Sequence, residues 1–266
     1  MIETNHFEEV TQIKMSLEVD GRPIYWTAAY LVDRLLIDTG PKHTSEELIQ
    51  FLGGQKLNLA VNTHWHEDHI GANKLIQQKY GIEIFAHHES IPLIAQFPSL
   101  PPYREWIWGF PESTKVSLLR EKIDTEHYHF DVIETPGHSE GHVALVEPKK
   151  GWCFSGDLFV NERPKVTHPK TNLPKTITSM IKLAELETDR LILLTSTGRI
   201  IKDGHKALQT CIEYLQDLTQ KAKNLEKRGL SVTAIREKLI GEESSLAPIT
   251  KGELSSENLI RAVLQE

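Results

Sequence analysis

The sequence contains the stretch Thr63-His-Trp-His-Glu-Asp-His69, in which three histidines and an aspartate fall within six residues. It directly follows Leu57–Asn62, where apolar residues alternate with polar or small ones, so we expect a strand that shows one face to a core. Because side chains alternate along an extended backbone, His64 and His66 would point to the same side. Such a concentration of nitrogen and oxygen ligands behind a strand predicts a metal-binding loop rather than a solvated surface.

Two later segments carry ligand-type residues in equivalent places. His138 stands in a Pro-Gly turn after the β-rich run Phe130–Thr135, and Asp157 follows the run Trp152–Ser155. An active site on a sheet scaffold usually collects at the ends of its strands. We therefore expect His138 and Asp157 to join the first cluster.

Further β-rich runs and helical patterns surround these segments. A capping box at Thr44–Glu47 predicts a helix that ends at Gly53, and we expect further helices over Ala72–Tyr80 and Thr178–Leu186. Strands group in two sets, each followed by helix, which indicates two packed sheets with helices outside. The further runs that we expect to be strands are Val10–Val19, Ile24–Val32, Arg34–Ile37, Ile82–Ala86, His142–Val146 and Leu191–Leu194.

The pattern of apolar residues divides the chain into two parts. Residues 1–205 hold the predicted sheets, whereas residues 206–266 keep helical spacing and predict a small C-terminal helical cap. The cap either covers the main domain or forms one wall of the substrate pocket. Residues 92–112 interleave prolines with aromatic residues; core filling is the expected role of these rings, and a lid over the metal site is the functional alternative.

The motifs together resemble those of the metallo-β-lactamase superfamily over about residues 10–200. Thr63–Ala72 is similar to its His-x-His-x-Asp-His signature, and the other similar motifs are Asp38–Gly40, Thr135–His138 and Ser155–Asp157. The resemblance implies an α/β fold, a four-layer αββα sandwich with the metals at one edge between two sheets. It also implies these ligands: His64, His66 and His138 for one metal, Asp68 and His69 for a second, and Asp157 as the bridge.

One position departs from the family pattern. Thr197 stands where the family usually supplies a late histidine for the second metal. A neutral hydroxyl is a far poorer ligand than imidazole, so the second site is predicted to be weak or differently completed. His205 and His168 are the possible substitutes.

The ligand set implies a chemistry. Three imidazoles and an open position favour zinc, with manganese or iron also accepted, and such a metal activates water for attack on an acyl carbonyl. Asp68 would orient that water or pass a proton to the leaving group. Asp38 is expected to fix a ligand histidine, His142 to be a hydrogen-bonded loop residue, and Glu67 to be solvated.

We therefore expect a metal-dependent hydrolase acting on a small ester, thioester or lactone. The alternatives are a mononuclear iron dioxygenase acting on a persulfide, and a degenerate protein that binds a ligand without catalysis. With a net charge of -7, we expect the protein to bind neither nucleic acid nor an anionic membrane surface. The 266 residues start without a secretory signal pattern and contain two cysteines in apolar surroundings, which predicts a cytoplasmic protein with reduced thiols. Nothing in the pattern specifies an oligomeric state.

Overall fold

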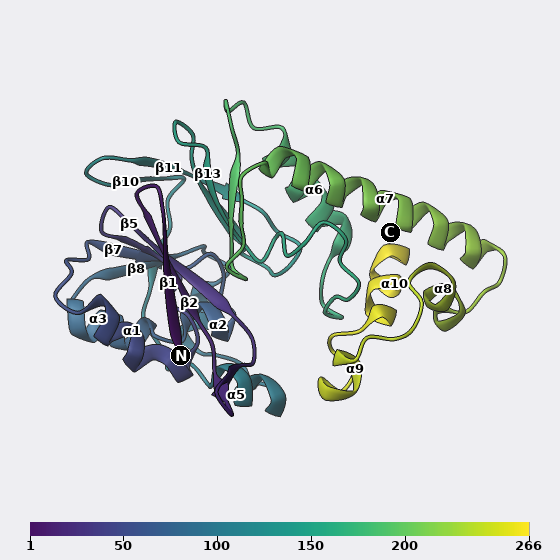
Figure 1. Ribbon diagram of the computed structural model, residues 1–266, viewed down its shortest axis with the longest axis horizontal. Helices are drawn as coiled ribbons and strands as arrows, with labels where there is room; N and C mark the ends of the chain where they lie inside the picture. Colours follow the sequence, from purple (N-terminus) through teal and green to yellow (C-terminus); the bar gives the residue numbers. More distant parts are fainter. Residues whose placement is uncertain (266) are drawn as a thin grey trace.

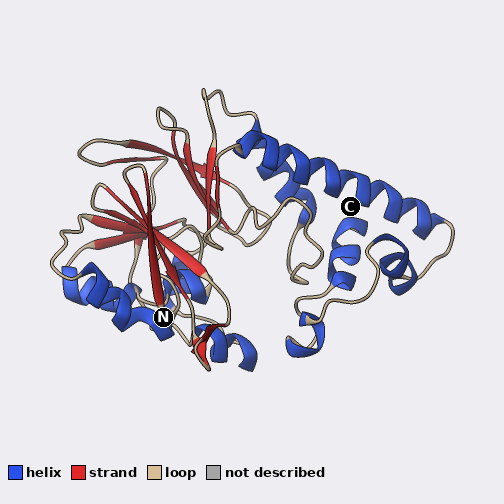
Figure 2. Cartoon of the chain, viewed as in Figure 1, coloured by secondary structure: helices blue, strands red, loops and turns tan. Residues whose placement is uncertain are grey.

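Two β-sheets face each other in the computed structural model, which describes residues 1–265 of the chain (Figure 2). The first sheet has seven strands in the order β1-β2-β5-β6-β7-β8-β9, and the second has six in the order β10-β11-β12-β13-β14-β15. A separate two-stranded hairpin, β3 (Glu18–Val19) with β4 (Arg22–Pro23), projects from the first half of the chain.

The strands of the first sheet are β1 (Ile2–Phe7), β2 (Val10–Met15), β5 (Thr27–Val32), β6 (Leu35–Ile37), β7 (Leu59–Val61), β8 (Glu83–Ala86) and β9 (Ser117–Leu118). Those of the second are β10 (Lys122–Asp124), β11 (His129–Glu134), β12 (Val143–Glu147), β13 (Trp152–Gly156), β14 (Ile192–Thr195) and β15 (Ile200–Ile201). Neighbours from β6 to β9 pair parallel, as do β13 and β14, and the other pairs are antiparallel.

Apolar side chains from the two sheets meet in a core between them, which we call the inter-sheet core. Within it the rings of Tyr30 and Phe154, one from each sheet, meet edge to face with centroids 5.3 Å apart. The Tyr30 hydroxyl also donates to the carbonyl of Thr195 at 2.6 Å. The buried phenol of Tyr30 thus satisfies its polar end while its ring joins the two sheets.

Helices cover the outer face of each sheet (Figure 1). The helices of the first half are α1 (Ser45–Leu52), α2 (Glu67–Ile70), α3 (Asn73–Tyr80), α4 (Ile91–Ala95) and α5 (Pro102–Trp108), with a 3-10 turn at Lys42–Thr44. Those of the second half are α6 (Leu173–Ala184), α7 (Gly204–Lys227), α8 (Val232–Leu239), α9 (Leu246–Ile249) and α10 (Ser256–Leu264). The predicted four-layer αββα sandwich is confirmed.

The strand β7 differs from its predicted pattern. Ala60 packs in the core beneath the helices of the first half, whereas Val61 packs in the inter-sheet core, so both faces of the strand are buried. The expectation of a single buried face is therefore wrong. It arose because the small Ala60 was counted with the polar residues of the alternating pattern. Burial on both faces is usual for strands that pair parallel on either side, as β7 does.

Two helix starts also differ from the sequence pattern. The Thr44 hydroxyl donates to the carbonyl of Pro41 instead of capping α1, so the predicted capping box is wrong although the helix ends at Gly53 as expected. α6 begins at Leu173, five residues before the predicted start at Thr178. Asn172 caps it by accepting a hydrogen bond from the backbone of Lys175 at 3.0 Å.

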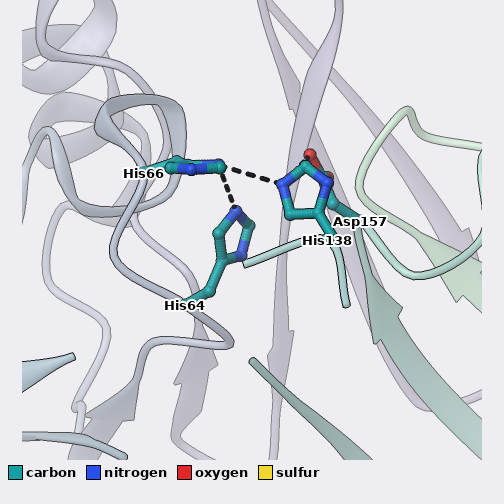
Figure 3. Close-up of side chains that lie close together, drawn as sticks. All are labelled: His64, His66, His138 and Asp157. Carbon is teal, nitrogen blue, oxygen red and sulfur yellow. Dashed lines mark hydrogen bonds and ion pairs between the residues drawn. The ribbon is translucent and has the colours of Figure 1, made fainter. Parts of the chain in front are cut away.

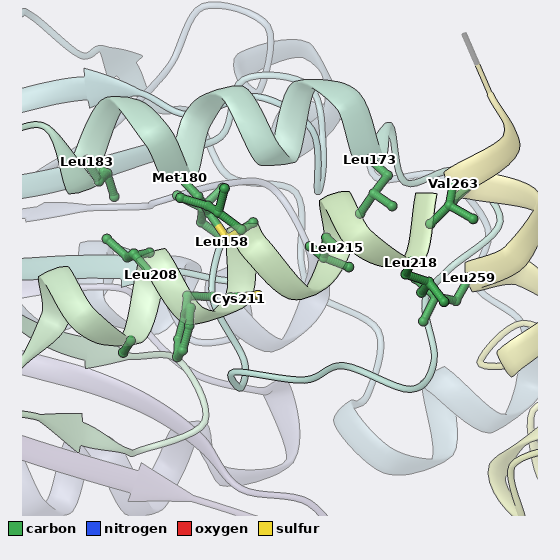
Figure 4. Close-up of a cluster of buried hydrophobic side chains, with 14 of the residues drawn as sticks. Leu158, Leu173, Met180, Leu183, Leu208, Cys211, Leu215, Leu218, Leu259 and Val263 are labelled. Atoms are coloured by element: carbon green, nitrogen blue, oxygen red, sulfur yellow. The ribbon is translucent and has the colours of Figure 1, made fainter. Parts of the chain in front are cut away.

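The C-terminal helices pack on the second sheet through α6 and α7. Leu208, Leu215 and Cys211 of α7 meet Met180 and Leu183 of α6 in a buried cluster that also receives residues of α10 (Figure 4). Both cysteines are buried and free, as expected for core thiols. No helix within residues 1–265 combines the length and the apolar character needed to cross a bilayer.

The aromatic segment 92–112 contributes α4 and α5. Trp108 is buried with 8% of its surface exposed, in agreement with core filling, and its ring meets Tyr25 edge to face at 5.6 Å. The expectation is wrong for Trp106 and Phe110, which are 53% and 43% exposed. The segment therefore packs on one face and presents aromatic rings to solvent on the other.

Candidate metal centre

Three loops bring ligand-type side chains to one end of the two sheets. The loop after β7 carries His64 and His66, the loop between β11 and β12 carries His138, and the turn after β13 carries Asp157. His138 and Asp157 therefore join His64 and His66, as predicted, although the four residues come from both sheets. This position agrees with the expectation of a site at an edge between two sheets.

The donor atoms converge closely (Figure 3). Nδ1 of His66 lies 3.0 Å from Nε2 of His64 and 2.9 Å from Nε2 of His138. Nε2 of His138 is in turn 3.2 Å from Oδ2 of Asp157. One donor atom from each of these four residues lies within 4.8 Å of the others. Nitrogens this close together need a proton or a cation between them.

The other two predicted ligands adjoin this cluster. Nε2 of His69 lies 3.3 Å from Oδ1 of Asp157 and 3.6 Å from Oδ2 of Asp68. His69 is fully buried, and its ring lies 4.0 Å from that of His64. The two predicted ligand groups are thus adjacent and share Asp157.

Residues outside the cluster hold the ligands in place. Oδ2 of Asp38 accepts from Nδ1 of His69 at 2.7 Å, and the same carboxylate accepts from the backbone and the hydroxyl of Thr63 at 2.8 Å. Nε2 of His142 accepts from the backbone N–H of Asp157 at 3.1 Å, while its Nδ1 contacts the Thr135 hydroxyl at 2.8 Å. These contacts fit the expected supporting roles of Asp38 and His142.

Burial sets the charge state of the three imidazoles. It lowers the pKa of His64 and His66 well below the ordinary value, and the nearby histidines lower both further. Burial likewise lowers the pKa of His138 to about 4, against the opposing charge of Asp157. Neutral imidazole is the form that binds a metal.

The acidic side of the cluster carries excess negative charge. Burial disfavours protonation of His69, but Asp38, Asp68 and Asp157 outweigh it and raise the pKa of His69 well above its ordinary value. Burial raises the pKa of Asp68 to about 7; His69 opposes the shift, and Asp157 adds to it. Three largely buried carboxylates around one imidazole favour a cation among them.

A divalent cation fits this donor set. Tetrahedral zinc with bonds of about 2.0–2.1 Å to nitrogen would hold its nitrogens about 3.3 Å apart. The two contacts of His66 Nδ1 with Nε2 of His64 and Nε2 of His138, at 3.0 and 2.9 Å, are close to that spacing. Nε2 of His69 is buried without a hydrogen-bond partner among residues 1–265, yet it faces two carboxylates. Such an orphaned atom is an exception among buried polar groups and suits a metal ligand.

Glu67 is not solvated, contrary to the sequence interpretation. Its side chain is fully buried, and Arg104 of α5 donates to it from Nε at 2.6 Å and from Nη2 at 3.0 Å. Arg104 was not recognised in the sequence because it lies 37 residues away in the aromatic segment. No local pattern pointed to it.

The two substitutes considered for the late histidine take other roles. Nδ1 of His205 contacts the carbonyl of Ala184 at 2.9 Å, and His168 pairs with Glu253 at 3.1 Å. Neither belongs to the four-residue donor group. Thr197, in the turn after β14, keeps its hydroxyl 3.1 Å from that of Thr195.

An αββα sandwich with histidines and aspartates gathered at one edge defines a class of metal-binding proteins. The sequence profile described as the metallo-beta-lactamase superfamily matches residues 27–195. The chain belongs to this superfamily. The resemblance inferred from the motifs is thereby confirmed.

Curated relatives point to hydrolysis. A hydroxyacylglutathione hydrolase (GloC) of Haemophilus influenzae is 31% identical over 168 residues, which cover 59% of this chain and 77% of that protein. A probable metallo-hydrolase (YybB) of Bacillus subtilis is 29% identical over 170 residues, covering 61% of this chain and 74% of the relative. The chain is a metal-dependent hydrolase of the superfamily.

Solved structures share the fold. A beta-lactamase domain protein from Burkholderia ambifaria superposes with a TM-score of 0.68 at 17% identity, covering 99% of this chain and 82% of that one. A metallo-beta-lactamase family protein from Thermus thermophilus gives a TM-score of 0.65 at 17% identity, covering 95% of this chain and 90% of the other. Both superpositions cover nearly the whole chain, so the shared fold includes helices as well as the two sheets.

Proposed function

We propose that this enzyme hydrolyses a small acyl thioester, with esters and lactones as chemically related substrates. The observation that supports the proposal is the convergence of His64, His66, His138 and Asp157 within 4.8 Å. The Haemophilus influenzae relative is named a hydroxyacylglutathione hydrolase, and an acylated glutathione is a thioester. That name favours thioesters among the acyl compounds.

We further propose how the six side chains divide the metals. The assignment is His64, His66 and His138 for the first metal, Asp68 and His69 for the second, and Asp157 as the shared ligand. The first site has three neutral imidazoles and is the stronger one. The second lacks a late histidine because Thr197 occupies that position, so its affinity is lower.

Zinc is the proposed metal, with manganese or iron acceptable to the same ligands. When bound, it supplies Lewis-acid polarisation of an acyl carbonyl and makes water nucleophilic near neutral pH. The chain itself supplies orientation: Asp38 fixes His69, and His142 holds the backbone of Asp157. The side chains of His138 and Asp157 are 21% and 20% exposed, which leaves an approach for substrate.

Asp68 is the proposed acid and base. Its Oδ2 is 3.5 Å from the Thr27 hydroxyl and 3.6 Å from Nε2 of His69, at the border of the cluster. When the second metal is absent, this carboxylate is free to accept a proton from water and to return it to the leaving group. A thiolate leaving group needs that proton less than an alkoxide does, so thioester hydrolysis would depend on Asp68 less than ester hydrolysis does.

A substrate panel tests the proposal. Protein stripped of metal and reloaded with zinc is assayed against an S-acetyl thioester, an aryl acetate and δ-valerolactone. We expect zinc-dependent hydrolysis with the thioester turned over fastest. The proposal fails if zinc supports none of the three reactions while iron-loaded protein consumes oxygen with a low-molecular-weight persulfide. Binding without turnover of any substrate would support a non-catalytic role instead.

A further inference from the structure

Arg104 reaches from α5 to the metal-binding loop. Its Nε and Nη2 donate to the two carboxylate oxygens of Glu67, at 2.6 and 3.0 Å. Glu67 is fully buried and stands in the sequence between His66 and Asp68. The bidentate pair therefore places a fixed guanidinium against the loop that carries four of the proposed ligands.

Glu67 ties Arg104 to the middle of the metal-binding loop. The residues on either side of Glu67 are His66, a proposed ligand of the first metal, and Asp68, a proposed ligand of the second. The guanidinium paired with Glu67 therefore lies beside the backbone that carries both ligands.

Part of the guanidinium has no partner. Of its five N–H groups, Glu67 engages one on Nε and one on Nη2. The other three, which include both on Nη1, have no hydrogen-bond partner within residues 1–265, and the side chain is 14% exposed. The ring of Trp108 lies 5.7 Å from Cζ and flanks the group on one face.

A purely structural role explains this arrangement poorly. Buried ion pairs contribute little net stability, and an apolar contact would hold α5 against the loop as well. Pairing with Glu67 does fix the direction of the fork, which lowers the entropy lost when the free N–H groups bind a ligand. The planar fork matches a carboxylate in particular.

We propose that Arg104 binds a carboxylate of the substrate, so that the preferred substrates are acyl thioesters that carry a second, anionic group. The inference rests on the proposed function, and Arg104 is its specificity-determining residue. Glu253, the nearby carboxylate of the C-terminal part, does not compete for the fork. It accepts hydrogen bonds from the Tyr103 hydroxyl at 2.8 Å and from Nε2 of His168 at 3.1 Å.

Matched substrates test this inference on the zinc-loaded full chain. S-acetyl-3-mercaptopropionic acid and its amide differ in charge on the leaving thiol, and S-ethyl monothiosuccinate and its amide differ in charge on the acyl side. We expect wild type to prefer the acid of at least one pair by about tenfold or more in kcat/KM, mainly through KM. Release of free thiol measures all four reactions.

The variants separate binding from folding. In Glu67→Gln/Arg104→Gln no charge is left buried and unpaired, and the preference for the acid should fall to about threefold or less. Arg104→Lys keeps the charge but not the fork, so it should retain only part of the preference. Arg190→Lys is the matched control, because Arg190 also makes a bidentate pair with a glutamate, Glu8, outside the metal centre. This variant should keep the full preference for the acid.

Two outcomes would overturn the inference. One is a wild type that treats the acid and the amide alike in both pairs. The other is a double variant, or Arg104→Lys if the double variant does not fold, that keeps the full wild-type preference. Failure of the proposed function gives a different result, since wild type would then hydrolyse none of the four thioesters.

Discussion

Oδ2 of Asp38 accepts a hydrogen bond from Nδ1 of His69 at 2.7 Å, and this contact leaves Nε2 of the same ring facing Asp68 and Asp157. A carboxylate can only accept, so Nδ1 carries a proton and Nε2 is the ring nitrogen that can bind a metal. Asp38 itself has a left-handed backbone with φ 59° and is tied to Thr63 by two hydrogen bonds. A residue outside the donor set therefore orients one of its members.

Asp38→Asn should weaken metal binding while leaving the fold intact. Asparagine tolerates the left-handed backbone but is neutral, so His69 loses its charged partner and its fixed orientation. We expect a loss of about 10–100-fold in affinity for the second metal, measured by competition with a chromogenic chelator. Asp20→Asn is the control, since Asp20 also has a left-handed φ, of 50°, but is exposed and lies outside the groups that could hold a metal. Equal affinities in the two variants would contradict the role given to Asp38.

Gly137→Ala should displace His138. A Cβ at this position would lie 2.4 Å from the backbone nitrogen of Thr176, and φ is 137°. The turn would have to move, and the donor next to it would move too. We expect turnover to fall at least about tenfold, with an accompanying loss of bound zinc. Gly54→Ala, where a Cβ meets nothing within 4 Å, should change neither quantity; unaltered activity in Gly137→Ala would show that the turn is not needed.

Thr197→His should complete the second metal site. An imidazole is a much better ligand for a borderline metal than the threonine hydroxyl that now contacts Thr195. We expect the variant to retain more zinc after dialysis than wild type, as determined by elemental analysis. Thr197→Asn adds bulk without an imidazole and should retain the wild-type amount. If Thr197→His binds no additional zinc, the second site is not limited by this position.

Leu215→Ala should destabilise the enzyme because it opens a cavity between α6 and α7. Leu215 is 1% exposed within the cluster that joins the C-terminal helices to the second sheet. We expect a loss of about 2–5 kcal/mol in the free energy of unfolding, measured by urea titration followed by circular dichroism. Leu118→Ala, at a leucine that is 58% exposed, should cost much less. Similar losses in both variants would mean that α7 is not part of the core.

The ligands in the loop after β7 could be predicted because they are close together in the sequence. His64, His66, Asp68 and His69 follow one strand within six residues, so their convergence needed only the geometry of that strand and its turn. The strand-end positions of His138 and Asp157 were weaker signals that became informative together. The sheets and most strands followed from β-rich runs.

Contacts between distant residues could not be predicted in the same way. Glu67 looked solvated because its partner, Arg104, lies on a different element, and nothing near either residue indicates the pair. The burial of both faces of β7 was not predicted, because the small side chain of Ala60 did not mark its face of the strand as apolar. The start of α6, in contrast, had local signals in Asn172 and Pro174, which favour a helix N-terminus.

The zinc content and thioester turnover of wild type and His66→Ala, purified in parallel, test the central claim most directly. His66 Nδ1 lies within 3.0 Å of both neighbouring imidazole donors, so its loss should dismantle the first metal position. We predict that wild type retains zinc, loses turnover on chelation and regains it on zinc addition, whereas His66→Ala retains neither zinc nor turnover. Wild-type turnover in His66→Ala, or turnover that survives complete removal of metal, would contradict the account.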